Sequence, residues 1–160
     1  MVYLLPISLD PYRWLISYRK PATLSSTEGE LYASFATDGN FKTIYTEDPG
    51  TNYSATLLES TPTLQIDLEM SVPVFRIHIK GIEYNGFDPG QTYLTVRVGD
   101  NPTVGSTENP QCGSTMSVNK WQRMTCGKKG RYVNVIRAVP NSGSQFKLVE
   151  VAVLKKPLGD

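Results

Sequence analysis

A glutamate stands inside a stretch that otherwise reads as a buried β-strand, "QFKLVEVAVL" at residues 145–154. A charged group there costs several kcal/mol unless it is offset, because even a neutral polar group costs about 2–7 kcal/mol to bury without a hydrogen bond. Glu150 therefore needs a cation, an ion pair with Lys or Arg, or partial solvation of its face. The arginines to consider as partners are Arg76, Arg97, Arg131 and Arg137. Strand alternation places Glu150 on the same face as Phe146, Leu148, Ala152 and Leu154, and it places three valines on the opposite face.

The second set of residues that could do chemistry is the cysteine pair in "CGSTMSVNKWQRMTC", residues 112–126. A metal pair or a redox pair would need a suitable spacing or further His and Cys nearby, and neither is present. We therefore predict a disulfide between Cys112 and Cys126, which would stabilise the fold by about 3 kcal/mol in the chain-entropy model. Such a bond indicates an oxidising compartment. The sequon Asn52-Tyr53-Ser54 fits the same compartment and makes Asn52 a candidate glycosylation site.

Composition excludes several classes of function. The chain has 160 residues, enough for one domain, and 16 basic against 15 acidic residues give a net charge of +1. This balance argues against a dedicated nucleic-acid surface, and no apolar run is long enough for a membrane span. The apolar start "MVYLLPISLD" is not typical of a signal peptide, because it has no basic residue and contains a proline. With one histidine and scattered carboxylates, the chain is not expected to be an enzyme.

Short runs of alternating hydrophobicity predict the elements that must position these residues. They are separated by Gly-, Pro- and Asn-rich turns, and no helical stripe exceeds two turns, although 27–37 could hold one short helical turn. An all-β antiparallel sandwich or barrel follows from this pattern. The only histidine, His78, falls within such a run beside Arg76 and is expected at the surface or at a sheet edge. The predicted strands are 63–69, 73–80, 93–98, 131–138 and 146–154.

The order of these motifs is similar to that of the discoidin-like, galactose-binding jelly-roll domains. The motifs are "KPATLSST", "ASFATDGN", "LQIDLE", "VFRIHI" and "VRVGDN". In the second half, "NPQCGSTM", "QRMTCGKKGRYVNV" and "FKLVEVAVL" resemble the fucolectin branch of that family. The resemblance implies an eight-stranded antiparallel jelly-roll β-sandwich. It covers about residues 17–154 of a single domain, 1–160.

The resemblance also implies one structural calcium ion, which would answer the question raised by Glu150. Calcium takes six to eight oxygens at about 2.3–2.6 Å, supplied by carboxylates and backbone carbonyls. The "TDGN" segment is equally typical of a plain β-turn, and an ion pair of Glu150 remains the alternative. The implied ligands are the side chains of Asp38, Thr51 and Glu150 and the backbone carbonyls of Phe35, Asn40 and Val149.

The sugar site of the family is not retained. Fucolectins hold fucose with one histidine and two arginines, and the corresponding positions here fall near Ser54, Ile82-Glu83 and Gly90-Gln91. Aromatic, amide and acidic side chains remain in the same loops, a set typical of both sugar-binding and protein-binding surfaces. The same residues could instead only pack the two loops together. The predicted ligand-binding residues are Asn52, Tyr53, Ser54, Glu83, Tyr84, Asn85, Phe87, Asp88 and Gln91.

We therefore expect an extracellular, calcium-stabilised, lectin-like recognition module, either secreted or part of the ectodomain of a larger protein. Its ligand would be a glycan or a glycoprotein. The alternative is a structural or adhesion domain, without sugar binding, inside a larger extracellular assembly. Nucleic-acid binding is not expected. Apolar loop residues such as Phe87, Leu57 and Leu58 lack the basic collar that membrane insertion needs.

Overall fold

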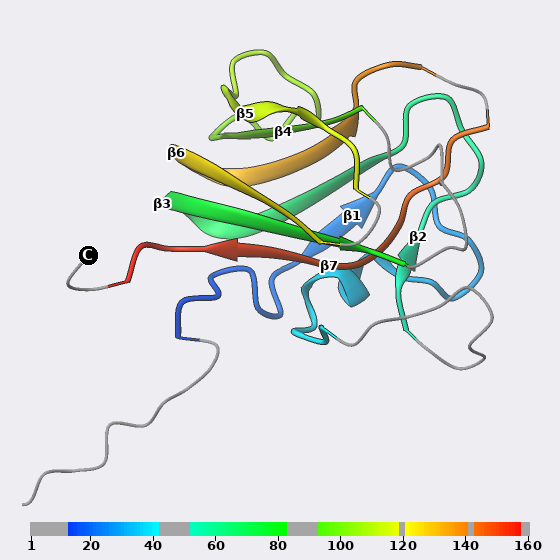
Figure 1. Cartoon of the computed structure of the whole chain (residues 1–160), viewed down its shortest axis with the longest axis horizontal. Helices are drawn as coiled ribbons and strands as arrows, with labels where there is room; N and C mark the ends of the chain where they lie inside the picture. The colour runs from blue at the N-terminus through cyan, green and yellow to red at the C-terminus, as the bar shows by residue number, and fades with distance from the viewer. Residues whose placement is uncertain (1–12, 42–51, 83–92, 119–120, 141–142, 158–160) are drawn as a thin grey trace, which may run out of the picture.

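The computed structural model describes residues 13–41, 52–82, 93–118, 121–140 and 143–157. These residues form seven antiparallel strands and one short 3₁₀ helix, arranged as in Figure 1. In the described part of the chain, no helix is long and apolar enough to span a membrane. The elements are β1 (Ala22–Leu24), η1 (Ala33–Thr37), β2 (Ser54–Ala55), β3 (Thr63–Gly81), β4 (Leu94–Gly99), β5 (Gln111–Met116), β6 (Trp121–Arg137) and β7 (Lys147–Leu154).

Two long strands, β3 and β6, turn back on themselves and run through both layers of the sandwich (Figure 1). The first half of β3 pairs with β1, and its second half pairs with β7, while β6 follows it along both halves. The register shifts between Asp67 and Val72 and again between Val74 and Arg76. The separate strands predicted at 63–69 and 73–80 are thus one bent strand. Pro73, which cannot donate a ladder hydrogen bond, lies at this irregular stretch.

The strand that carries Glu150 lies inside the sheet, between β2 and β3. Its position explains why both of its faces are apolar, and Phe146, Leu148 and Val151 are fully buried. The helix η1 packs against β7 and buries Ala33 and Ala36, so the predicted short helical turn within 27–37 is confirmed. The jelly-roll prediction is confirmed as well, with strand pairings that are antiparallel throughout the described residues.

The predicted disulfide is present and joins β5 to β6. The Cα atoms of Cys112 and Cys126 lie 4.5 Å apart, and both residues are buried. Sequence reasoning missed β5 and the first half of β6, because "QCGSTM" and "WQRMTCGKKG" contain few of the branched and aromatic residues typical of strands. The pairing of these segments is set by the rest of the sheet and by the disulfide.

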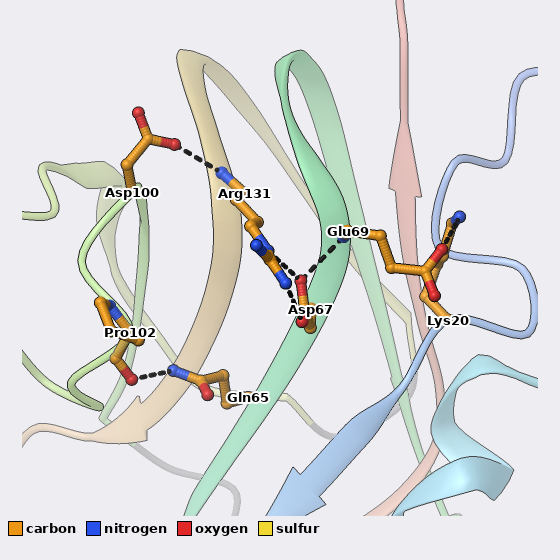
Figure 2. Close-up of polar contacts among 7 residues, drawn as sticks. All are labelled: Lys20, Gln65, Asp67, Glu69, Asp100, Pro102 and Arg131. Carbon is orange, nitrogen blue, oxygen red and sulfur yellow. Dashed lines mark hydrogen bonds and ion pairs between the residues drawn. The ribbon is translucent and has the colours of Figure 1, made fainter.

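A polar network closes the end of the sandwich where β3 and β6 bend (Figure 2). The Arg131 guanidinium donates two hydrogen bonds to the Asp67 carboxylate, at 2.7 and 2.9 Å. The backbone N–H of Arg131 donates to Asp100, and that of Glu69 donates to Asp67. Lys20 pairs with Glu69 at 2.7 Å. The network therefore links the loop before β1, both bends and the loop after β4.

Candidate functional site

Glu150 is completely buried on β7, as its place in an apolar strand predicted. The backbone N–H of Gly39 donates to its Oε2 atom at 3.2 Å. Its Oε1 atom has no hydrogen-bond partner within the described residues. A buried carboxyl oxygen left without a partner costs free energy, so this position calls for a further group.

The turn that meets Glu150 follows directly after η1. Asp38 caps the end of η1, and its Oδ1 atom accepts a hydrogen bond of 2.8 Å from the backbone N–H of Asn40. Gly39 has φ of +77°, a left-handed conformation that glycine adopts without steric cost. This conformation aims the Gly39 N–H at β7, so the turn "TDGN" is built toward the buried glutamate.

Two acidic groups therefore lie together in a poorly solvated place. Burial and, to a smaller extent, the neighbouring Asp38 carboxylate raise the pKa of Glu150 to about 9, although the Gly39 N–H acts in the opposite direction. Without a cation, Glu150 would hold its proton at neutral pH. A cation between the two carboxyl groups would favour the ionised form.

The basic residues near Glu150 are engaged elsewhere. Lys80 is the register neighbour of Glu150 on β3, yet its Nζ atom donates to the backbone oxygen of Phe41 at 2.7 Å. Both ion pairs among the described residues involve other carboxylates, those of Glu69 and Asp67. The four candidate arginines have other neighbours: Arg131 binds Asp67, Arg97 and Arg137 donate to the carbonyls of Asn109 and Val139, and Arg76 lies over Phe75. Among the described residues, neither of the two ion pairs given above includes Glu150.

Three of the predicted calcium ligands would contribute backbone carbonyl oxygens. Phe35 lies in η1, Asn40 lies in the turn, and Val149 precedes Glu150 on β7. Among the described residues, no three or more His, Cys, Asp or Glu side chains lie close enough together to hold a metal ion. A site here would thus depend on two carboxylates and several carbonyls, a donor set that suits calcium. Thr51 lies outside the described residues.

The predicted ligand-binding residues divide into three groups. Asn52 is exposed, and Tyr53 is half-buried against Ile82 and Val149. Ser54 is fully buried in β2, and its hydroxyl donates to the carbonyl of Leu148 at 2.9 Å, so it lies too deep to face a ligand. The remaining six residues lie outside the described part of the chain: Glu83, Tyr84, Asn85, Phe87, Asp88 and Gln91.

Sequence reasoning missed an aromatic cluster at the start of β6. The rings of Phe41 and Trp121 stack with centroids 5.7 Å apart, and the edge of His78 meets Trp121 at 6.0 Å. The Lys80 Nζ atom lies 5.6 Å from the centre of the Trp121 ring. His78 is half-buried on β3, a strand that lies between β6 and β7, so its predicted edge position was wrong. A tryptophan inside an otherwise polar stretch was the signal that could have indicated this cluster.

Comparison with known proteins identifies the fold. No family model and no curated protein matches the sequence. Among solved structures, a fucose binding module of Streptococcus pneumoniae matches with a TM-score of 0.71 and 18% identity, over 89% of this chain and 98% of the other. A fucolectin from striped bass (Morone saxatilis) matches with a TM-score of 0.75 and 24% identity, over 90% of this chain and 48% of the other. The family 32 carbohydrate-binding module of NanJ from C. perfringens, solved with galactose, gives 0.65 and 17%, over 89% and 98%.

These neighbours share one architecture, the galactose-binding-like jelly roll, and the chain has that fold. The resemblance seen in the order of the sequence motifs is confirmed at this level. Within the fold, the neighbours are fucose-binding modules, a fucolectin and a family 32 carbohydrate-binding module.

Proposed function

We propose that this chain is a non-enzymatic recognition module that binds a glycan, free or on a glycoprotein, outside the cell. The proposal is carried by a structural match. The chain aligns with nearly the whole length of small modules whose names describe carbohydrate binding. The Cys112–Cys126 disulfide supports the extracellular setting, because such bonds persist in oxidising compartments.

The ligand would bind at the end of the sandwich where β2 begins and β3 ends. Asn52 and Tyr53 lie there, and Tyr53 packs on Ile82 at the end of β3. An exposed amide next to an aromatic side chain suits a sugar, which offers hydroxyl groups and an apolar ring face.

Free L-fucose is not the expected ligand. The position that corresponds to the histidine of fucolectins falls near Ser54, and Ser54 is buried with its hydroxyl bound to Leu148. We expect millimolar fucose to leave the melting temperature and the resonances of the loops unchanged. A micromolar affinity for fucose would contradict this prediction.

A calcium ion would also stabilise the module, between the turn after η1 and β7. Asp38 and Glu150 would hold it together with the carbonyls of Phe35, Asn40 and Val149, and Thr51 would complete the set. The Glu150 Oε1 atom, which has no hydrogen-bond partner within the described residues, and the neighbouring Asp38 carboxylate support this assignment. The ion would neutralise both carboxylates and tie the turn after η1 to β7.

The alternative is a structural or adhesion domain that binds no sugar. It is favoured by one observation, the exposed Asn52 of the sequon, because a glycan attached there would cover part of the proposed binding end. Protein made without glycosylation removes this complication from the experiment below.

A glycan array with unglycosylated protein tests the proposal. We expect binding to a defined set of glycans, reduced by Asn52→Ala and retained in Gln111→Ala, an amide variant on β5. No binding to any glycan, together with capture of a protein partner, would favour the structural alternative.

A further inference from the structure

One surface of β3 and β6 carries cations and aromatic rings next to each other. Strand alternation places Arg76, His78 and Lys80 on one face of β3, because Ile77 and Ile79 on the other face are fully buried. The pairing of β3 with β6 sets Arg123 beside His78 and Trp121 beside Lys80. Cross-strand neighbours share a face of the sheet, so these residues form one row. Arg76, Arg123 and Trp121 are exposed.

The row continues into a cluster of lysines. Lys128, Lys129 and Lys156 line a hollow of about 250 Å³ together with Pro73, Val74, Phe75 and Gly127. The guanidinium group of Arg76 lies 4.8 Å from the centre of the Phe75 ring, which joins the lysine cluster to Arg76 and the rest of the row. We call the whole surface, from Trp121 to Lys156, the basic face.

No acidic residue balances the basic face along its strands. The segments 73–82, 121–130 and 151–157 contain seven of the sixteen Lys and Arg residues and no Asp or Glu. Glu150, which precedes the last segment, is fully buried. The described ion pairs lie elsewhere, at Lys20–Glu69 and Arg131–Asp67. A net charge of +1 thus conceals an uneven distribution of charge, with the basic residues of these segments gathered on one surface.

At the aromatic end of the basic face, Trp121 packs against two other rings. It is 38% exposed, with the ring of Phe41 stacked on it and His78 in an edge contact. Burial, with Arg123 and Arg76 close by, lowers the pKa of His78. His78 is therefore neutral at pH 7. The exposed positive charge of this part of the face comes from Arg76 and Arg123, because Lys80 is buried and its Nζ atom donates to the carbonyl oxygen of Phe41.

We propose that the basic face binds a sulfated polysaccharide chain, at a site separate from the loop-end glycan site. Residues that share a face of a strand repeat at about 6.6–6.8 Å, and adjacent strands lie about 4.7–4.9 Å apart, so Arg76 and Arg123 lie close together on neighbouring strands. The bulge between Val74 and Arg76 separates these arginines from the lysine cluster, and a linear polymer with repeating sulfates can span both groups. The exposed ring of Trp121 at one end can pack against the apolar face of a sugar ring, a contact that a lipid headgroup or a DNA phosphate does not offer.

Heparin serves as the probe in a calorimetric titration at low and at physiological ionic strength. The variant K128Q/K129Q removes two charges from the basic face, and the matched control R19Q/K20Q removes two charges away from it. We expect the first to weaken heparin binding about tenfold and the control to leave it nearly unchanged. Equal loss in both variants, or no binding of heparin at low salt, would overturn the proposal.

Two further measurements separate a polysaccharide site from general attraction of polyanions. Trp121→Ala should weaken heparin binding while Trp121→Phe restores it, and the ring signals of the single histidine should shift during the titration. Desulfated heparin, duplex DNA and phosphatidylserine vesicles should all bind more weakly than heparin. Binding of DNA or vesicles as tight as that of heparin, and indifferent to Trp121→Ala, would overturn the proposal in favour of another polyanion. Asn52→Ala should bind heparin with the affinity of the wild type, because Asn52 belongs to the loop-end glycan site and not to the basic face.

Discussion

Arg131 on β6 holds the Asp67 carboxylate on β3 through two parallel hydrogen bonds, of 2.7 and 2.9 Å (Figure 2). The two residues are 64 positions apart in the chain, and they meet where both long strands bend. A planar guanidinium matches a carboxylate in this geometry, and a lysine would not. The pair fixes the register of the two bends relative to each other.

The pair predicts a pH dependence of stability. The Arg131 guanidinium holds the pKa of Asp67 below its usual value near 3.8. Because the folded-state pKa is the lower one, the contribution of Asp67 is fully present above pH 4 and disappears as pH falls through the folded-state pKa. Asp67→Asn should therefore lower the melting temperature by a few degrees at pH 7. On acidification, the melting temperature of this variant should fall less than that of the wild type. Melting curves between pH 2 and 7 measure both effects.

The matched control for this prediction is Glu69→Gln, which breaks the more exposed pair with Lys20. Exposed ion pairs contribute little, so its melting temperature should stay close to that of the wild type. An Asp67→Asn variant with the same acid sensitivity as the wild type would show that other carboxyl groups dominate. The arginine adds no slope in this range, because its pKa is raised above an already high value.

The close approach of β6 to the end of β4 predicts a severe effect of Gly130→Ala. A Cβ atom at Gly130 would lie 2.5 Å from the Cα and N atoms of Gly99, and backbone atoms cannot yield as a flexible side chain does. We expect a loss of about 3 kcal/mol in the free energy of unfolding, measured by urea denaturation. Gly127→Asn is the control, because nothing lies within 4 Å of a Cβ atom there and asparagine tolerates the positive φ of 65°. Similar stability of the two variants would contradict the steric argument.

The disulfide predicts a second loss of stability. Cys112 and Cys126 are buried and close a loop of 14 positions between β5 and β6. Replacing both with alanine should lower the free energy of unfolding by about 2–4 kcal/mol. Dithiothreitol should lower the melting temperature of the wild type toward that of the double variant and leave the variant unaffected. Two titratable thiols in the folded, unreduced wild type would refute the prediction.

Local patterns predicted the parts of the fold in which local and long-range forces agree. The alternation in 145–154 predicted the buried faces of β7, and the absence of metal or redox partners near the two cysteines predicted the disulfide. A short helical turn was predicted within 27–37, and η1 lies there. The unusual burial of Glu150 could also be recognised from the sequence, because a carboxylate within an apolar strand pattern needs no coordinates to be noticed.

The remaining features depend on how strands far apart in the sequence pair with one another, and local sequence patterns do not specify that pairing register. Arg123 adjoins His78 only because β3 and β6 pair antiparallel across a bulge, so the basic face could not be read from any single segment. Ser54 looks like a polar loop residue, yet its pairing with Leu148 buries it. The polar segments of β5 and early β6 become strands because their neighbours supply the hydrogen-bond partners.

The last prediction concerns Glu150 and calcium. Because burial and the neighbouring Asp38 carboxylate raise the pKa of Glu150 to about 9, we expect the metal-free protein at pH 7 to carry a neutral acid there, which Glu150→Gln closely imitates. We therefore expect metal-free wild type and Glu150→Gln to melt within a few degrees of each other.

Added calcium should separate the two proteins. A ligand that binds only the folded form stabilises it by about 2.7 kcal/mol at a hundredfold excess over Kd, so the wild type should gain several degrees and lose them again with chelator. Glu150→Gln and Asp38→Asn should show no such gain, because each removes one of the two carboxylates that would neutralise the ion. Glu69→Gln, which removes an exposed carboxylate paired with Lys20, should respond like the wild type. A wild-type melting curve indifferent to both calcium and chelator, with no metal found by elemental analysis, would leave Glu150 as a buried neutral acid bound to the Gly39 N–H.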